Sequence, residues 1–138
     1  MADVKITNNK DQVVKEMETK IDKALEMIGL QAEGDAKLEL ENSPRRVDTG
    51  RLRNSITHAH RAKSGFTNSY SDDEGGQFSD EVGDVPEEDR SVYIGTNVEY
   101  GPEIHEGRPG LDPNRFLKNA VEKNEATFRR MIEETLKE

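Results

Sequence analysis

The feature that most constrains the fold of this chain is a helical repeat of apolar residues near its N-terminus. Between positions 11 and 40 they recur every three or four residues, with Lys and Glu on the opposite face: Val14, Met17, Ile21, Ala24, Leu25 and Ile28. The pattern predicts an amphipathic helix over residues 11–42, which Pro44 ends at the latest. Gly29 and Gly34 each cost about 1 kcal/mol inside a helix, so we expect a bend or break near Gly29.

A second apolar stripe lies near the C-terminus and predicts a helix over residues 112–137. Asp112 is a good N-cap, and Pro113 is a good first helical residue. The stripe is interrupted by Asn124 and consists of Phe116, Leu117, Ala120, Val121, Phe128, Met131, Ile132 and Leu136.

Short strands are predicted between the two helices. Residues 51–61 alternate in part, residues 91–96 are rich in β-formers, and residues 98–107 can add a further short strand. This order of elements indicates an α+β fold. We expect a single domain over residues 1–138, in which a long N-terminal helix and a C-terminal helix pack on a small antiparallel sheet.

Residues 62–90 are predicted to form a long, flexible acidic loop or insertion between strands. Within them, residues 72–89 hold nine of the 29 carboxylates of the chain and no Lys or Arg, and the other 20 carboxylates balance the 20 basic residues. Neither part has the basic excess that gives general affinity for nucleic-acid phosphates. Since only 31% of residues are apolar and 36% are charged, the core is small and we expect partners to complete it.

Composition also limits the location of the protein. The chain has no cysteine, which excludes disulfides and thiolate zinc sites. It has no apolar run long enough to span a bilayer, and its N-terminus lacks the apolar core of a signal peptide. We expect a protein that is made in a cytoplasm and is kept there or assembled there into something larger.

The tripeptide Asp48-Thr49-Gly50 matches the catalytic segment of aspartic proteases. That chemistry needs a buried aspartate at the end of an apolar strand, so that two carboxylates share one proton. The flanking Arg45, Arg46, Arg51 and Arg53 instead favour an ionised Asp48. A partner chain can supply a second aspartate, but the apolar flanks are missing. We therefore interpret the tripeptide as a turn, with Asp48 bonding to nearby backbone N–H groups, Gly50 supplying a positive φ, and Thr49 able to cap a short turn.

Other candidate chemistry is weaker. His58 and His60 would share one side of a strand, and His105 precedes Glu106, but no further ligands follow at the spacing of a zinc site. The glycine-bearing segments lack the spacing of a phosphate-binding loop, and the acidic loop lacks the pattern of an EF-hand. We expect no catalytic residue, cofactor or metal site, and hence no enzyme.

Three segments in order resemble the tail-component family of tailed bacteriophages, also called neck or tail-completion proteins. They are SPRRVDTGRLRNSI at 43–56, VYIGTNVEYGPEIHEG at 92–107 and DPNRFLKNAVE at 112–122. This chain departs from the family pattern in its two arginines between Pro44 and Val47 and in its longer acidic loop. The residues that carry the motifs and the turn are Pro44, Val47, Asp48, Thr49, Gly50, Leu52, Ser55, Gly95, Tyr100, Phe116 and Leu117.

The resemblance implies a non-enzymatic structural protein of the virion, located in the neck or upper tail and assembled in the host cytoplasm. It implies a ring, expected to be a hexamer, between the head–tail connector and tail tube proteins. Genome DNA would pass through its channel without sequence-specific binding, and no membrane is involved. Alternatives are a tail terminator that caps the tail tube, and a non-phage acidic binding or regulatory protein.

Two charged groups are candidates for contacts in such a ring. The acidic loop would line the channel and repel DNA, or meet the arginines of a neighbouring subunit. The residues concerned are Arg45, Arg46, Arg51, Arg53, Asp72, Asp73, Glu74, Asp80, Glu81, Glu87, Glu88 and Asp89.

Overall fold

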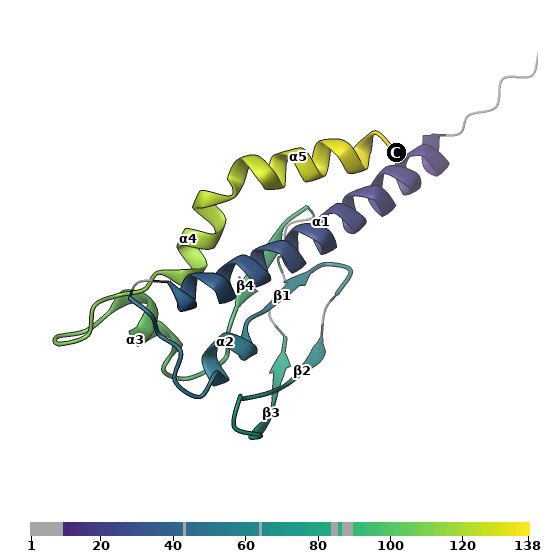
Figure 1. The fold of residues 1–138 in the computed structure, drawn as a ribbon. Coiled ribbons are helices and arrows are strands. Elements are labelled where there is room, and N and C mark those ends of the chain that lie inside the picture. Colours follow the sequence, from purple (N-terminus) through teal and green to yellow (C-terminus); the bar gives the residue numbers. More distant parts are fainter. Residues whose placement is uncertain (1–9, 43, 64, 84–85, 87–89) are drawn as a thin grey trace, which may run out of the picture.

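The computed structural model describes residues 10–42, 44–63, 65–83, 86 and 90–138, and Figure 1 shows their arrangement. The predicted α+β class is confirmed. The helices and strands, in chain order, are α1 (Lys10–Glu41), α2 (Arg51–Ser55), β1 (Thr57–His60), β2 (Phe66–Ser71), β3 (Gln77–Val82), β4 (Val92–Gly95), α3 (Gly101–Glu106), α4 (Phe116–Lys123) and α5 (Glu125–Leu136).

Helix α1 is continuous over 32 residues, so the break expected near Gly29 is wrong. The glycine is instead explained by close packing. A Cβ built on Gly29 would lie only 2.3 Å from Cδ2 of His58, which is buried against the helix. The buried face of α1 follows the helical repeat but begins only at Ala24: Ala24, Leu25, Ile28, Gly29, Ala32, Ala36 and Leu40.

The strands form two separate antiparallel pairs. β1 pairs with β4, with His58 opposite Ile94, and β2 pairs with β3, with Tyr70 opposite Phe78. The second pair lies within residues 62–90, so the expectation of a loop there is wrong for much of the segment. Its backbone is ordered by the hairpin ladder, and the stacked rings of Tyr70 and Phe78, 5.5 Å apart, give it an apolar contact.

Two predicted strands are in fact short helices. Residues 51–55 form α2 because the N–H of Asn54 donates to the carbonyl of Gly50 (2.9 Å), and only residues 57–60 continue as β1. The strand proposed within residues 98–107 is α3, which has Pro102 in its first turn, where proline is favoured. The strand proposed at 91–96 is confirmed as β4.

The C-terminal helix is divided in two by Asn124, at the position where its apolar stripe is interrupted. The side-chain amide of Asn124 donates to the carbonyl of Ala120 (2.8 Å), which ends α4. The helix begins at Phe116, with Arg115 in the N-cap position, so the predicted start at Asp112 and Pro113 is wrong. Residues 112–115 are held outside the helix by Asn114, whose backbone N–H donates to the carbonyl of Ile104 (2.9 Å).

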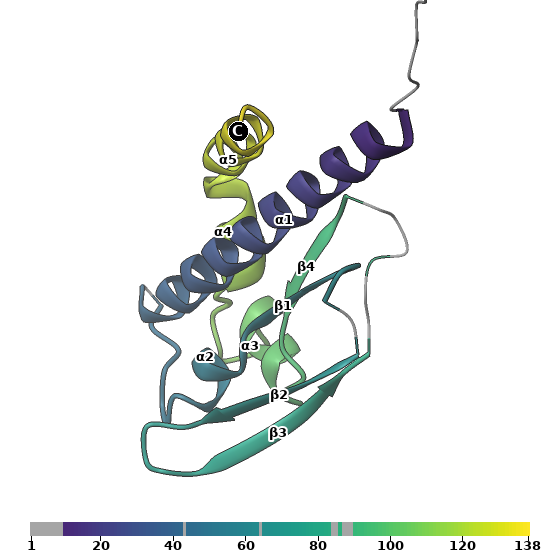
Figure 2. The ribbon, with the colours of Figure 1, turned by 90° about the vertical axis from the view of Figure 1, so that its right-hand side faces the viewer.

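Helix α1 forms the middle of the molecule (Figures 1 and 2). It packs against α4 and α5 on one side and against β1 and β4 on the other, so the C-terminal helices lie mainly on α1, with the sheet on the opposite side of that helix. The core at one end combines residues from both sides of α1: Ala36, Leu40, Leu52, Ile56, Val98, Phe116 and Ala120. No helix in the described ranges is both long and apolar enough to cross a membrane.

Candidate functional site

The segment 44–56 forms a turn that leads into α2, as predicted for Thr49 and Gly50. Gly50 has a left-handed φ of 86°, and the backbone N–H of Arg51 donates to Oγ1 of Thr49 (3.3 Å). A Cβ on Gly50 would also lie 2.6 Å from the carboxylate of Asp73. The N-cap residue of α2 is Gly50, which has no side-chain cap, and the bond from Arg51 to Thr49 belongs to the turn before the helix. Asp48 is exposed and in no position to share a buried proton with a second carboxylate.

The apolar residues of the three sequence segments meet in one core. Leu52 and Phe116 are buried there, and Val47, Tyr100 and Leu117 pack against them. Ser55 is fully buried, and its hydroxyl lies 2.6 Å from both the carbonyl of Leu52 and Oγ1 of Thr96. The segments are thus parts of one structural unit, although they are far apart in sequence.

Asn114 is a buried polar residue of this unit that the sequence did not single out. Its side-chain amide donates to the carbonyls of Glu39 (2.8 Å) and Pro44 (3.0 Å), so it ties the end of α1 to the start of the turn. In the sequence, the only indication of this role is that a polar residue stands between Pro113 and the apolar residues that begin at Phe116. Gly95 has no comparable role, because a Cβ there would meet no atom within 4 Å.

The arginines beside the turn are largely engaged within the chain. Arg53 bonds to Glu41 (2.6 Å) and to both oxygens of Asp73 (2.6 Å each). These bonds from Arg53, followed by one from Asn54, lower the pKa of Asp73, and the bond from Arg53 likewise lowers the pKa of Glu41. Arg51 bonds to Glu99 and lies 4.5 Å from the ring centre of Phe78.

The two remaining arginines also contact their own chain. Arg45 pairs with Glu41 (3.2 Å), and Arg46 donates to the carbonyl of Asp112 (2.8 Å). The arginine cluster therefore contacts the β2–β3 hairpin of the same chain, through the ion pair of Arg53 with Asp73. This pairing occurs without a neighbouring subunit, which differs from the use expected from the sequence.

Most of the acidic side chains of the hairpin likewise have partners in the chain. Asp72 accepts hydrogen bonds from the N–H groups of Glu74 and Gly76, which closes the β2–β3 turn. Asp80 accepts one from Tyr70 (3.0 Å), and Glu81 accepts one from Thr67 (2.9 Å). The three further acidic candidates, Glu87, Glu88 and Asp89, lie outside the described residues.

An open pocket of about 640 Å³ lies at this turn. Its walls combine cationic, acidic and apolar groups: Arg45, Arg46, Arg51, Arg53, Asp48, Asp72, Phe78, Tyr100 and Ile104. The Nε atoms of Arg46 and Arg51 are buried and have no partner in the described part of the chain. The pocket therefore presents charged and apolar groups together on one open surface.

The side chains best placed to hold a metal ion are elsewhere, between α1 and β1. They are Glu26, His58 and His60, of which the sequence indicated only the two histidines. Glu26 was not predicted as a ligand because 32 residues separate it from His58. The sequence does not indicate which residues of α1 lie beside β1.

Comparison with known proteins gives no match for the chain: no protein-family model fits it, and no curated protein or solved structure is significantly similar to it.

Proposed function

We propose that this chain is a structural protein of tailed-phage virions, a ring-forming neck or tail-completion component that joins the DNA-filled head to the tail. The proposal rests first on the three sequence segments that resemble that family. Their residues converge on one core and one turn, as expected if they conserve a common architecture. The partners would be further copies of the chain, the connector above and the tail tube below.

The observation that carries the assembly proposal is an apolar surface at the start of α1 that no other described part of the chain covers. This part of the helix projects beyond the sheet and beyond the end of α5 (Figures 1 and 2). Lys20 and Lys23 contact Glu138 at the end of α5, so residues 10–19 extend past that point and are exposed. Val13, Val14 and Met17 are 51%, 44% and 49% exposed.

A helical end of this kind is stabilised by packing on another surface, because short helices in water are marginal without it. The pocket at the turn, with its arginines and aromatic walls, is a different surface of the same molecule. When one surface of each subunit meets a different surface of the next, the assembly closes into a ring if the rotation allows. We expect six subunits.

The strand pairs provide further contact sites. Among the described residues each sheet has two strands, and two-stranded sheets are marginal by themselves. Their outer edges carry backbone groups that can pair with another chain. Tyr93 on β4 is 51% exposed next to such an edge. These edges favour an assembling protein over one that acts alone.

Native mass spectrometry and negative-stain electron microscopy of the purified protein test the proposal, alone and mixed with phage heads and tail tubes. We expect rings, and Val14→Glu should abolish them without unfolding the protein, because Val14 is outside the core. Gln12→Glu is the matched control, since it adds the same charge to the same exposed turn. A protein that stays monomeric in all mixtures, or a Val14→Glu variant that forms rings like the control, would refute this assembly.

The same mixtures separate the neck role from that of a tail terminator. A neck component should join filled heads to tails, whereas a terminator should bind the tail tube end and leave the heads free.

A further inference from the structure

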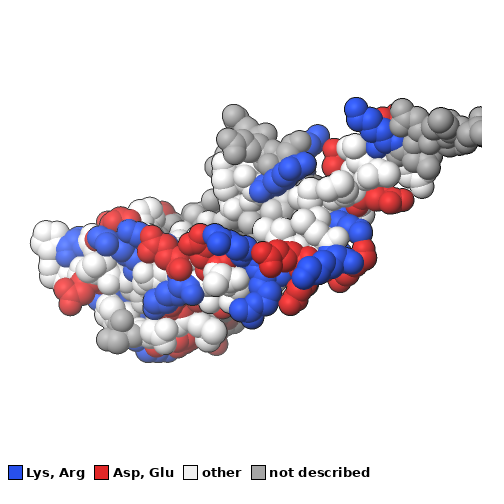
Figure 3. All heavy atoms as spheres, turned by 90° about the horizontal axis from the view of Figure 1, so that it is seen from above, with Lys and Arg blue, Asp and Glu red and all other residues white. Residues whose placement is uncertain are grey.

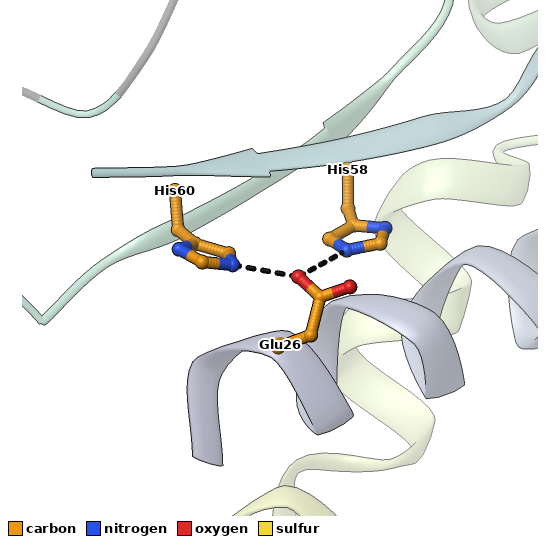
Figure 4. A group of neighbouring side chains, drawn as sticks. All are labelled: Glu26, His58 and His60. Carbon is orange, nitrogen blue, oxygen red and sulfur yellow. Dashed lines mark hydrogen bonds and ion pairs between the residues drawn. The ribbon is translucent and has the colours of Figure 1, made fainter. Parts of the chain in front are cut away.

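Glu26, His58 and His60 come together at the contact between α1 and β1, as Figure 4 shows. Oε2 of Glu26 lies 2.9 Å from Nε2 of His58 and 2.7 Å from Nε2 of His60. The two imidazoles are almost fully buried, with 1% and 4% of their side chains exposed, whereas 38% of the Glu26 side chain is exposed. Two nitrogens of buried rings and one oxygen of a partly exposed carboxylate thus lie together.

The backbone dictates this arrangement. His58 and His60 are two residues apart on β1, so both rings leave the strand on the same side, toward α1. Gly29 lets the ring of His58 lie directly on the helix, where a Cβ would collide with it. Glu26 stands one turn before Gly29 on the same helix and therefore reaches both rings.

Both ring nitrogens of His58 face carboxylates. Its Nδ1 lies 3.0 Å from Oε1 of Glu33, and its Nε2 lies 2.9 Å from Oε2 of Glu26. A neutral imidazole carries a single N–H and can donate to only one of these carboxylates. The other nitrogen keeps a lone pair, which can accept from Nζ of Lys63, 3.3 Å from Nε2, or can bind a metal ion in its place.

We propose that Glu26, His58 and His60 bind one divalent transition-metal ion, with Zn²⁺ the best fit for two imidazoles and a carboxylate. The ligands would be Oε2 of Glu26 and both Nε2 atoms, with water in the fourth position. Tetrahedral zinc needs ligand atoms about 3.3 Å apart. The Glu26 carboxylate must therefore withdraw slightly, which the exposure of its side chain permits, and the two Nε2 atoms, within 4.8 Å of each other, must adjust to the same spacing. The ion would link α1 to β1.

The surroundings of His58 favour this role. A carboxylate on the second nitrogen of a metal-bound histidine fixes its tautomer and orientation, and Glu33 has that position. His60 has no such support, because its Nδ1 is buried and lacks a partner among the described residues. We therefore infer that His58 is the better-oriented of the two imidazole ligands.

Lys63 opposes metal binding. Its Nζ lies 3.3 Å from Nε2 of His58 and 3.8 Å from Oε1 of Glu26, close to the position that the ion would take. Two cations cannot share that position, so Lys63 must swing toward solvent when the metal binds, and about a third of its side chain is already exposed. Replacing Lys63 by a neutral residue should therefore increase the affinity of the site for the metal ion.

The test is a Zn²⁺ titration of the full chain after treatment with a chelator. Calorimetry should show one ion per chain, the Tm should rise with Zn²⁺ because the ion binds only the folded state, and Co²⁺ should give the intense visible absorption of a low-symmetry site. Glu26→Gln should abolish binding. Glu33→Gln should weaken it about 10–100-fold, and Lys63→Gln should strengthen it.

Two control variants separate this site from incidental binding. Glu18→Gln removes an exposed carboxylate from α1, and His105→Gln removes the remaining histidine, which lies beside Glu106. Both should bind Zn²⁺ like the unmodified protein. The proposal is overturned if the unmodified protein binds no Zn²⁺, if Glu26→Gln and Glu18→Gln bind equally well, or if His105→Gln is the variant that loses binding.

Discussion

At the residue scale, Gly29 and Gly34 lie in the same helix but in different surroundings. A Cβ on Gly29 would overlap His58, whereas one on Gly34 would meet no neighbouring side chain within 4 Å. We expect Gly29→Ala to destabilise the fold by about 1–3 kcal/mol through overpacking. Gly34→Ala, the matched control, should stabilise it by up to about 1 kcal/mol, because alanine favours the helix. Urea unfolding measures both free energies, and equal effects would contradict the close packing.

The pairing of Arg53 with Asp73 makes the stability of the fold depend on pH, because it lowers the pKa of Asp73. Hydrogen bonds from Arg53 and then Asn54 lower the pKa of Asp73 in the folded state. The folded protein therefore holds this carboxylate ionised more readily than the unfolded chain does. The resulting stability is present above the ordinary aspartate pKa of about 3.9 and is lost as the pH falls through the lowered folded value.

We accordingly expect Asp73→Asn to lose less stability on acidification than the unmodified protein does. Urea midpoints at neutral and acidic pH measure the difference. Glu74→Gln is the control, since Glu74 is the exposed neighbour in the same turn. An unchanged acid dependence in Asp73→Asn would mean that the ion pair is not formed in solution.

At the element scale, the sequence predicted those parts whose periodicity is strong. Helix α1, the C-terminal helical region and β4 were readable because their apolar residues recur at the spacing of the element. Residues 51–55 were misread, because alternation over a few residues does not distinguish a strand from one helical turn. There the left-handed conformation of Gly50 and the bond from the Asn54 N–H to the Gly50 carbonyl accompany the helical turn.

The β2–β3 hairpin was missed because acidic composition outweighed its pattern. Phe66, Tyr70, Phe78 and Val82 are spaced so that Tyr70 faces Phe78 and Phe66 faces Val82 across the ladder. The turn glycines, Gly75 and Gly76, marked the reversal. The candidate site was predictable only in part. The motif residues were identified from the sequence, but their meeting in one core depends on tertiary packing, and so does the contact of Glu26 with β1.

At the scale of the whole molecule, charges of both signs lie close together on one face and also where Arg53 meets Asp73 of the β2–β3 turn. On the face seen in Figure 3, acidic and basic side chains are interspersed. Within the hairpin, Asp72, Asp73, Asp80 and Glu81 accept hydrogen bonds from the chain itself. Their first role is therefore to order the hairpin. An influence on DNA in a ring channel would come from the net charge that they retain.

That influence can be separated from the ordering role by a variant that keeps the hydrogen bonds. Asp80→Asn with Glu81→Gln removes two charges but leaves oxygens to accept from Tyr70 and Thr67. If the hairpin faces the channel, assembled rings of this variant should bind duplex DNA more tightly at low salt, because less repulsion opposes the phosphates. Fluorescence anisotropy of labelled duplex over a salt series measures the change.

The matched control is Glu122→Gln with Glu134→Gln, which removes two exposed charges from α4 and α5. If both double variants gain the same DNA affinity, only net charge matters and the hairpin has no special position relative to the DNA. Loss of rings in the hairpin variant alone, with its fold intact by circular dichroism, would assign Asp80 and Glu81 to a subunit contact. A gain in DNA affinity confined to the hairpin variant, with rings retained, is the result that the channel arrangement requires.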